Sequence, residues 1–92
     1  MITREEILAR IIKVSEFELG LKPIAEIAAT EQKSVEDLHV SDDLGADSLD
    51  KVELLLALDK EFEVDTQPHE HELKDINTIG GLADFYLKKI AP

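Results

Sequence analysis

Few side chains in the 92-residue chain could act as a nucleophile or as a catalytic base. There is no cysteine, which excludes a thiol nucleophile, a disulfide framework and a thiolate zinc site. The three histidines, His39, His69 and His71, fall in segments that we expect to be loops, and no Gly-x-Ser-x-Gly elbow is present. A serine nucleophile needs an oriented base. We therefore expect a protein that is not itself an enzyme.

Ser48 is the serine whose neighbours carry the most information. It follows Asp47 at the expected start of a helix, and either residue is suited to cap that helix. If Asp47 is the cap, the Ser48 hydroxyl is free to project into solvent. A phosphodiester on this hydroxyl would then lie near the unpaired N–H groups of the helix N-terminus, where an anion is favoured.

The helix is expected to run from Ser48 or Leu49 to Glu61 or Phe62, and its apolar residues form two stripes. One stripe should fill the core and consists of Leu54, Leu55, Leu58 and Phe62. The other starts beside Ser48 and consists of Leu49, Val52 and Leu56. A helix of so small a protein rarely needs two buried faces, so the second stripe indicates a docking surface. The alternative is that Val52 lies under the preceding loop and the other two are merely exposed.

The charge of the chain is concentrated around this helix. Ten Lys and Arg against 21 Asp and Glu give a net charge of −11. Between Glu36 and Asp65, eleven acidic residues and two lysines give −9 of that total. Such a surface disfavours nucleic acid and anionic lipid and speeds encounter with basic proteins.

Two further regions must hold the helix in place on its N-terminal side. Thr3 and Glu6 fit a capping box, and helical spacing of apolar residues predicts a helix from Arg4 to Leu19, ended by Gly20. From 21 to 47 we expect a long loop with a short helical turn after Pro23. Four apolar residues should pin this loop to the core: Val35, Leu38, Val40 and Leu44.

The C-terminal third is expected to hold one short and one long helix. The stretch 63–71 should be loop, followed by a short helical turn that includes Leu73 and Ile76. Asn77 or Thr78 should cap the last helix, whose first turn Gly80 and Gly81 weaken by about 1 kcal/mol each relative to alanine. With no strand-like alternation, the chain is expected to be all-α, a small bundle of three longer helices and one short helix, in a single domain spanning 1–92.

The residues around Ser48 match a known family. The run Asp-Leu-Gly-Ala-Asp-Ser-Leu-Asp at 43–50, followed by Val52-Glu53-Leu54 and Glu61-Phe62, resembles the acyl carrier proteins, and the resemblance covers nearly the whole chain. It implies an antiparallel four-helix bundle. It also implies that Ser48 carries 4′-phosphopantetheine, transferred from coenzyme A by a phosphopantetheinyl transferase. The thiol of that arm would hold acyl groups as thioesters, sheltered in the bundle interior.

The resemblance also implies partners and the residues that meet them. We expect acyl-loading, condensing or acyltransferase enzymes of fatty-acid, lipid or polyketide synthesis, with basic docking surfaces. The residues expected to contact them are Asp47, Leu49, Asp50, Val52, Glu53, Leu56 and Asp59. The carrier should be a monomer. The acidic N-terminal residues argue against a targeting peptide, and no stretch suits a membrane span, so we expect a cytoplasmic protein.

Two other hypotheses remain at this point. An aminoacyl or peptidyl carrier would use the same Ser48 chemistry. An acidic helical metal-binding protein is disfavoured, because Asp42, Asp43, Asp47 and Asp50 lack the order of an EF-hand loop and His69-x-His71 is too sparse for zinc. Departures from the common carrier pattern suggest a specialised member: Lys60, Gln67, Gly80-Gly81 and the long loop before Ser48.

Overall fold

The computed structural model describes residues 2–90, and the elements within them are helical apart from one isolated antiparallel bridge between His39 and Thr78. The helices are α1 (Arg4–Leu19), α2 (Ile24–Glu31), η1 (Val35–Asp37), α3 (Ser48–Phe62), η2 (Gln67–His69), α4 (Glu70–Lys74) and α5 (Ile79–Ile90), of which η1 and η2 are 3-10 turns. The predicted all-α class, a small helical bundle, is confirmed.

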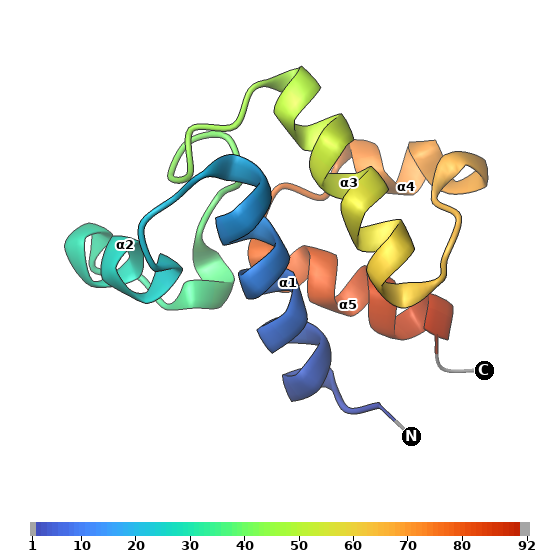
Figure 1. The fold of residues 1–92 in the computed structure, drawn as a ribbon, viewed down its shortest axis with the longest axis horizontal. Helices are drawn as coiled ribbons and strands as arrows, with labels where there is room; N and C mark the ends of the chain where they lie inside the picture. Colours follow the sequence, from blue (N-terminus) through green and yellow to red (C-terminus); the bar gives the residue numbers. More distant parts are fainter. Residues whose placement is uncertain (1, 91–92) are drawn as a thin grey trace.

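The first long helix is the centre of the packing. Helix α1 lies against both α3 and α5, and η1 packs on α5, whereas α2 stands apart at one end of the molecule (Figure 1). Ile7 and Ile11, one turn apart on α1, are fully buried in the common core. The long helices therefore hold α3 from its inner side and leave its outer side accessible.

The bounds of α1 are those predicted from the sequence, and of the predicted capping box the structure shows the Thr3 half. The Thr3 hydroxyl oxygen accepts the N–H of Glu6 at 3.2 Å. Gly20 has the left-handed φ of 61° that glycine tolerates, and its N–H donates to the carbonyl of Glu16. Local signals thus fix this helix at Arg4–Leu19.

The long loop between α1 and α3 contains a full helix where only a short turn was expected. Helix α2 has eight residues, and its N-cap residue, Pro23, offers no side-chain cap. The carboxylate of Glu16 on α1 supplies the missing partner, because it accepts the N–H of Ile24 at 2.6 Å. Ile24 and Ala28, one turn apart, are buried. The cap comes from another helix and was therefore invisible in the local sequence.

The stretch 63–71, expected to be loop, is also partly helical. Residues Gln67–His69 form η2, and α4 starts at Glu70, so the predicted short turn lies earlier than expected and His69 and His71 are in helical segments. Pro68 suits the start of a helical turn, because a proline there loses no hydrogen bond. Leu73 is the residue of α4 that is buried in the core.

Gly80 marks a close approach of η1 to α5. A Cβ atom at Gly80 would lie 3.0 Å from Glu36 Cβ and 3.1 Å from the Glu36 carbonyl oxygen. Arg4 holds the two elements together, since its guanidinium contacts the carboxylates of Glu36 at 2.6 Å and Asp84 at 2.7 Å. The sequence indicated only a weakened first turn of α5, whereas the structure gives Gly80 a packing role.

Gly80→Ala should therefore destabilise the protein, although alanine is the better helix former. Crowding against the Glu36 backbone outweighs the gain in helix propensity, and we expect a loss of about 1 kcal/mol in the free energy of unfolding. Urea denaturation measures it. Gly81→Ala is the control, because its Cβ would meet side-chain atoms, Ile76 Cγ2 and Thr78 Oγ1, both at 3.1 Å. A stabilised Gly80→Ala protein would contradict the packing role.

Candidate functional site

The first turn of α3 presents the Ser48 hydroxyl to solvent. Asp47 is the N-cap: its side chain accepts the N–H of Asp50 at 2.8 Å, and the Asp50 carboxylate accepts the N–H of Asp47 at 3.1 Å. This reciprocal pair is a capping box. Ser48 is exposed and is not needed as a cap. The interpretation in which Asp47 caps and Ser48 is free is confirmed, and the part of Asp50 in the box is new.

The loop before Ser48 is held by buried side chains and by one carboxylate. Asp43 Oδ2 accepts the backbone N–H of His39 at 2.7 Å and contacts the Lys33 ammonium at 2.9 Å. These two contacts lower the pKa of Asp43 below its ordinary value, the His39 N–H having the larger effect. All four predicted anchors contribute, since Leu38, Val40 and Leu44 are buried and Val35 packs partly buried against the core.

The two apolar stripes of α3 separate as predicted. Leu54, Leu58 and Phe62 are buried, and Leu55 is partly buried against them. The second stripe is exposed, with Leu49 at 64%, Val52 at 53% and Leu56 at 51%. Val52 therefore does not lie under the preceding loop, and the stripe is free to contact a partner.

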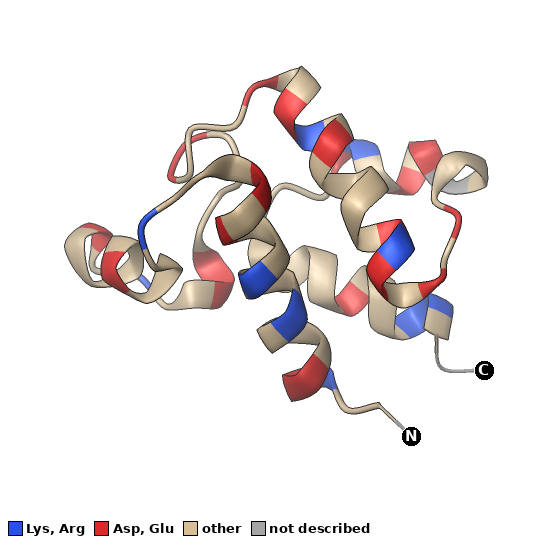
Figure 2. Ribbon diagram, viewed as in Figure 1, with Lys and Arg blue, Asp and Glu red and all other residues tan. Residues whose placement is uncertain are grey.

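Acidic residues surround this exposed stripe. Figure 2 shows acidic residues on the first turns of α3 and on the loop before it, and basic residues on α1, at the end of α5 and on α3 itself. Asp47 and Glu53 are exposed and Asp50 is half-buried. We call Ser48 with Asp47, Leu49, Asp50, Val52, Glu53 and Leu56 the Ser48 face.

Asp59 makes hydrogen bonds to the interior that the sequence did not indicate. Its carboxylate is half-buried and accepts three hydrogen bonds: from the Thr66 N–H at 3.1 Å, the Thr66 hydroxyl at 2.8 Å and the Tyr86 hydroxyl at 2.9 Å. Burial, with a smaller contribution from Asp59, raises the pKa of Tyr86 well above its ordinary value. These bonds hold the Asp59 oxygens toward Thr66 and Tyr86, and contact of Asp59 with a partner enzyme stays a prediction.

Two hollows meet at Ser48. A groove of about 330 Å³ runs between α3 and α4, and it is lined by Ser48, Lys51, Val52, Leu55, Leu56, Gln67, Glu70, Leu73 and Lys74. A hollow of about 280 Å³ on the other side is lined by Val40, Ser41, Ala46, Asp47, Ser48, Lys51 and Asn77. Lys51 borders both, and its ammonium donates to the carbonyls of Ile76 at 2.9 Å and Leu73 at 3.4 Å. No sequence signal pointed to this role of Lys51.

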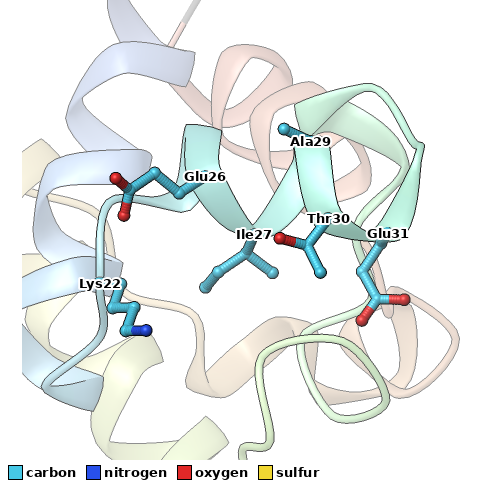
Figure 3. Close-up of a pocket in the computed structure, with 6 residues that line it drawn as sticks. All are labelled: Lys22, Glu26, Ile27, Ala29, Thr30 and Glu31. Carbon is cyan, nitrogen blue, oxygen red and sulfur yellow. The ribbon is translucent and has the colours of Figure 1, made fainter.

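Two other hollows lie away from the Ser48 face. One of about 580 Å³ lies between α1 and α3 and is bordered by Phe17 and Lys60. The other, of about 650 Å³, lies on α2, where the side chains of Lys22, Glu26, Ile27, Ala29, Thr30 and Glu31 line it (Figure 3). Neither includes Ser48.

Within residues 2–90, no group of three or more potential metal ligands is arranged to hold an ion. Over the same residues, no helix combines the length and apolar character that crossing a bilayer requires.

Comparison with known proteins decides the family. A family profile described as "Phosphopantetheine attachment site" matches residues 21–86. The acyl carrier protein of Cyanidium caldarium is 32% identical over 90 residues, which cover 98% of this chain and 93% of that protein. The chain belongs to the acyl carrier proteins.

Two further acyl carrier proteins have similar sequences. That of Thermotoga maritima is 32% identical over 90 residues, covering 98% of this chain and 99% of the relative. That of Buchnera aphidicola is 46% identical over 59 residues, covering 64% of this chain and 71% of the relative. The predicted family, carrier function and phosphopantetheine cofactor are confirmed. The alternatives, an aminoacyl carrier and a metal-binding protein, are not favoured.

The geometry around Ser48 fits the cofactor of the acyl carrier proteins. A phosphopantetheine arm needs an accessible hydroxyl for its phosphodiester and space beside it for a flexible chain. Ser48 is exposed, the capping box leaves its oxygen free, and hollows lie on both sides of it. When bound, the group supplies the thiol that this cysteine-free acyl carrier chain lacks.

Neutralising Asp43 should loosen the loop that leads to Ser48. Asp43→Asn keeps the shape of the side chain and loses its charge, so we expect a lower melting temperature than wild type at pH 7. The pKa of Asp43 is lowered on folding, so its contribution is present above the unfolded pKa of about 3.9 and is lost as the pH falls below it.

Thermal denaturation at pH 7 and at pH 3 tests this sign. The difference between wild type and Asp43→Asn should shrink at the lower pH. Asp42→Asn is the matched control, because the Asp42 side chain is 80% exposed and only approaches His39 at 3.7 Å. An equal effect of both substitutions at pH 7 would contradict the role of Asp43.

Proposed function

We propose that Ser48 is the residue that carries the 4′-phosphopantetheine arm. The proposal is supported by the start of α3, where Asp47 caps the helix and Ser48 remains exposed. In the attachment step, the Ser48 oxygen bonds to the β-phosphorus of coenzyme A. The P–O bond to the adenosine bisphosphate breaks, that group leaves, and the serine proton is released.

The start of α3 favours the phosphodiester that results. The N–H of Asp50 is used by the Asp47 side chain, and the N–H of Lys51 donates to the Asp47 carbonyl. The N–H groups of Ser48 and Leu49 belong to the same first turn and remain for an anion or water. The partial positive charge of the helix N-terminus adds to this attraction.

We further propose that the Ser48 face is the docking surface for the enzymes that load and use the carrier. Its exposed leucines and valine supply apolar contact area, and its carboxylates supply the attraction for basic enzymes. The partners are a phosphopantetheinyl transferase and acyl-loading, condensing or acyltransferase enzymes. In these reactions the protein acts as a substrate for other enzymes.

The remaining expectations also stand as proposals. Residues 1–92 are proposed to form a single carrier domain, supported by relatives that align over 98% of the chain and by a continuous hydrophobic core. The monomeric state, the cytoplasmic location and the specialised role inferred from Lys60 and the long loop stay predictions.

Ser48→Ala should abolish attachment and leave the fold intact. Incubation with coenzyme A, magnesium and a phosphopantetheinyl transferase should add one phosphopantetheinyl group to wild type and none to the variant, as measured by intact mass. Because Asp47 caps α3, the variant should keep the helicity and melting temperature of wild type. Ser41→Ala, which changes an exposed serine beside the same hollow, should be modified normally. A modified Ser48→Ala protein would refute the assignment.

Glu53→Lys should slow association with the transferase. Glu53 is exposed on the Ser48 face and has no part in the capping box, so reversing its charge changes the field without disturbing the helix start. We expect the association rate constant at low salt to fall by up to about tenfold and the difference to shrink as salt rises.

Stopped-flow binding measures this rate, and the chain offers a matched control. Glu26→Lys makes the same change in net charge on α2, beside a hollow that Ser48 does not line (Figure 3). It should slow association much less. Equal rates for the two variants would mean that only the total charge matters and that the Ser48 face has no special part.

A further inference from the structure

The groove between α3 and α4 has one end at Ser48 and another at η2. Lys51 and Leu73 border it close to Ser48, whereas Leu55, Leu56 and Gln67 border it farther along α3. Its lining along α3 is largely apolar. An acyl chain carried by the arm on Ser48 and lying in this groove would therefore extend toward η2.

A polar cluster lies beyond this second end. Thr66 directly precedes Gln67, and Thr66 is buried with both its N–H and its hydroxyl bonded to the Asp59 carboxylate. Tyr86 of α5 is fully buried, and its hydroxyl is 2.9 Å from Asp59 and 3.4 Å from the carbonyl oxygen of Leu55. We call Asp59, Thr66 and Tyr86 the end cluster.

The cluster cannot open cheaply to admit an apolar chain. The Tyr86 ring packs against Phe62, at 5.1 Å between ring centroids, and against Phe85, at 5.3 Å, and the residue as a whole is buried. Separating the Tyr86 hydroxyl from Asp59 would cost a buried hydroxyl its shorter hydrogen bond and would remove one of the three bonds that the Asp59 carboxylate accepts, which is unfavourable. The segment that covers the groove is also held at both ends, by Asp59 at Thr66 and by Lys51 at Leu73 and Ile76.

We propose that the end cluster is a polar wall that limits the length of the acyl chain this carrier can shelter, so that its cargo is a short acyl group. The proposal rests on Ser48 as the attachment residue. A short chain fills the groove of about 330 Å³ between Ser48 and Gln67. A long straight chain meets the wall, and its remaining carbons stay in solvent or outside the groove.

The test loads the full-length protein with chains of different length. A phosphopantetheinyl transferase attaches butanoyl-, octanoyl- or hexadecanoyl-phosphopantetheine from the matching acyl-coenzyme A, and intact mass reports the loading. The melting temperature of each product is then compared with that of the protein carrying the unacylated arm. We expect the increase to grow from butanoyl to octanoyl and to grow no further with hexadecanoyl.

Removing the polar wall should extend this range. In Asp59→Leu/Thr66→Val/Tyr86→Phe the end of the groove becomes apolar, and the hexadecanoyl group should raise the melting temperature roughly twice as much as the octanoyl group, in line with the apolar area buried. Glu63→Gln is the control, because it removes an exposed carboxylate at the end of α3 and leaves the end cluster unchanged. It should behave as wild type.

If the triple variant does not fold, the melting temperatures of the acylated wild-type protein still test the proposed length limit. A melting temperature that still rises from octanoyl to hexadecanoyl in wild type would overturn the proposal, as would faster hydrogen exchange of the Thr66 amide in the hexadecanoyl form, since a closed cluster keeps that amide bonded to Asp59. Failure of any arm to attach to Ser48 overturns the proposed function and this inference with it. The mass measurement distinguishes that failure from a loaded protein that lacks a length limit.

Discussion

The accessibility of Ser48 depends on the capping box between Asp47 and Asp50. A helix start leaves N–H groups without partners, and a serine at such a position commonly uses its own oxygen to satisfy them. Here a pair of aspartates takes over that task, one on each side of the serine. The loop that brings Asp47 into place is in turn fastened by Asp43 and by buried Leu38, Val40 and Leu44. The stability of the helix start and the freedom of the hydroxyl are thus provided by different residues.

Several of the ten basic residues hold segments of the fold together, and their placement affects the charge of the Ser48 face. Arg4 joins Glu36 and Asp84, Lys33 holds Asp43, and Arg10 approaches Glu61 at 3.6 Å. Exposed ion pairs of this kind stabilise a fold only slightly one by one. Their placement matters more, because these cations lie on α1 or beside α2, so the carboxylates of Asp47 and Glu53 are not neutralised.

Local signals in the sequence were sufficient for the elements that carry their own caps. Thr3 caps the start of α1 and Gly20 caps its end, and Asp47 caps the start of α3. Both helices could therefore be placed from the residues at their ends. Helix α2 was underestimated because Glu16, on another helix, caps it. The hydrogen bond between Asp59 and Tyr86 was not foreseen for a similar reason, since helical spacing puts Asp59 on the acidic side of α3 but gives no sign of Tyr86, 27 positions away. What the sequence could not reveal were contacts between distant segments.

The packing of α1 against α5 has a consequence for how the protein is made. Ile7 and Ile11 are buried in a core that also contains Ile79, Leu82 and Tyr86, so contacts that close the core join the two ends of the described chain. During synthesis on the ribosome, the first helix must wait for the last one to emerge before its apolar face is covered. Under the proposed function, the modifying enzyme that recognises the folded start of α3 therefore meets its substrate only after α5 has been made. On this reasoning the arm is added to a finished bundle.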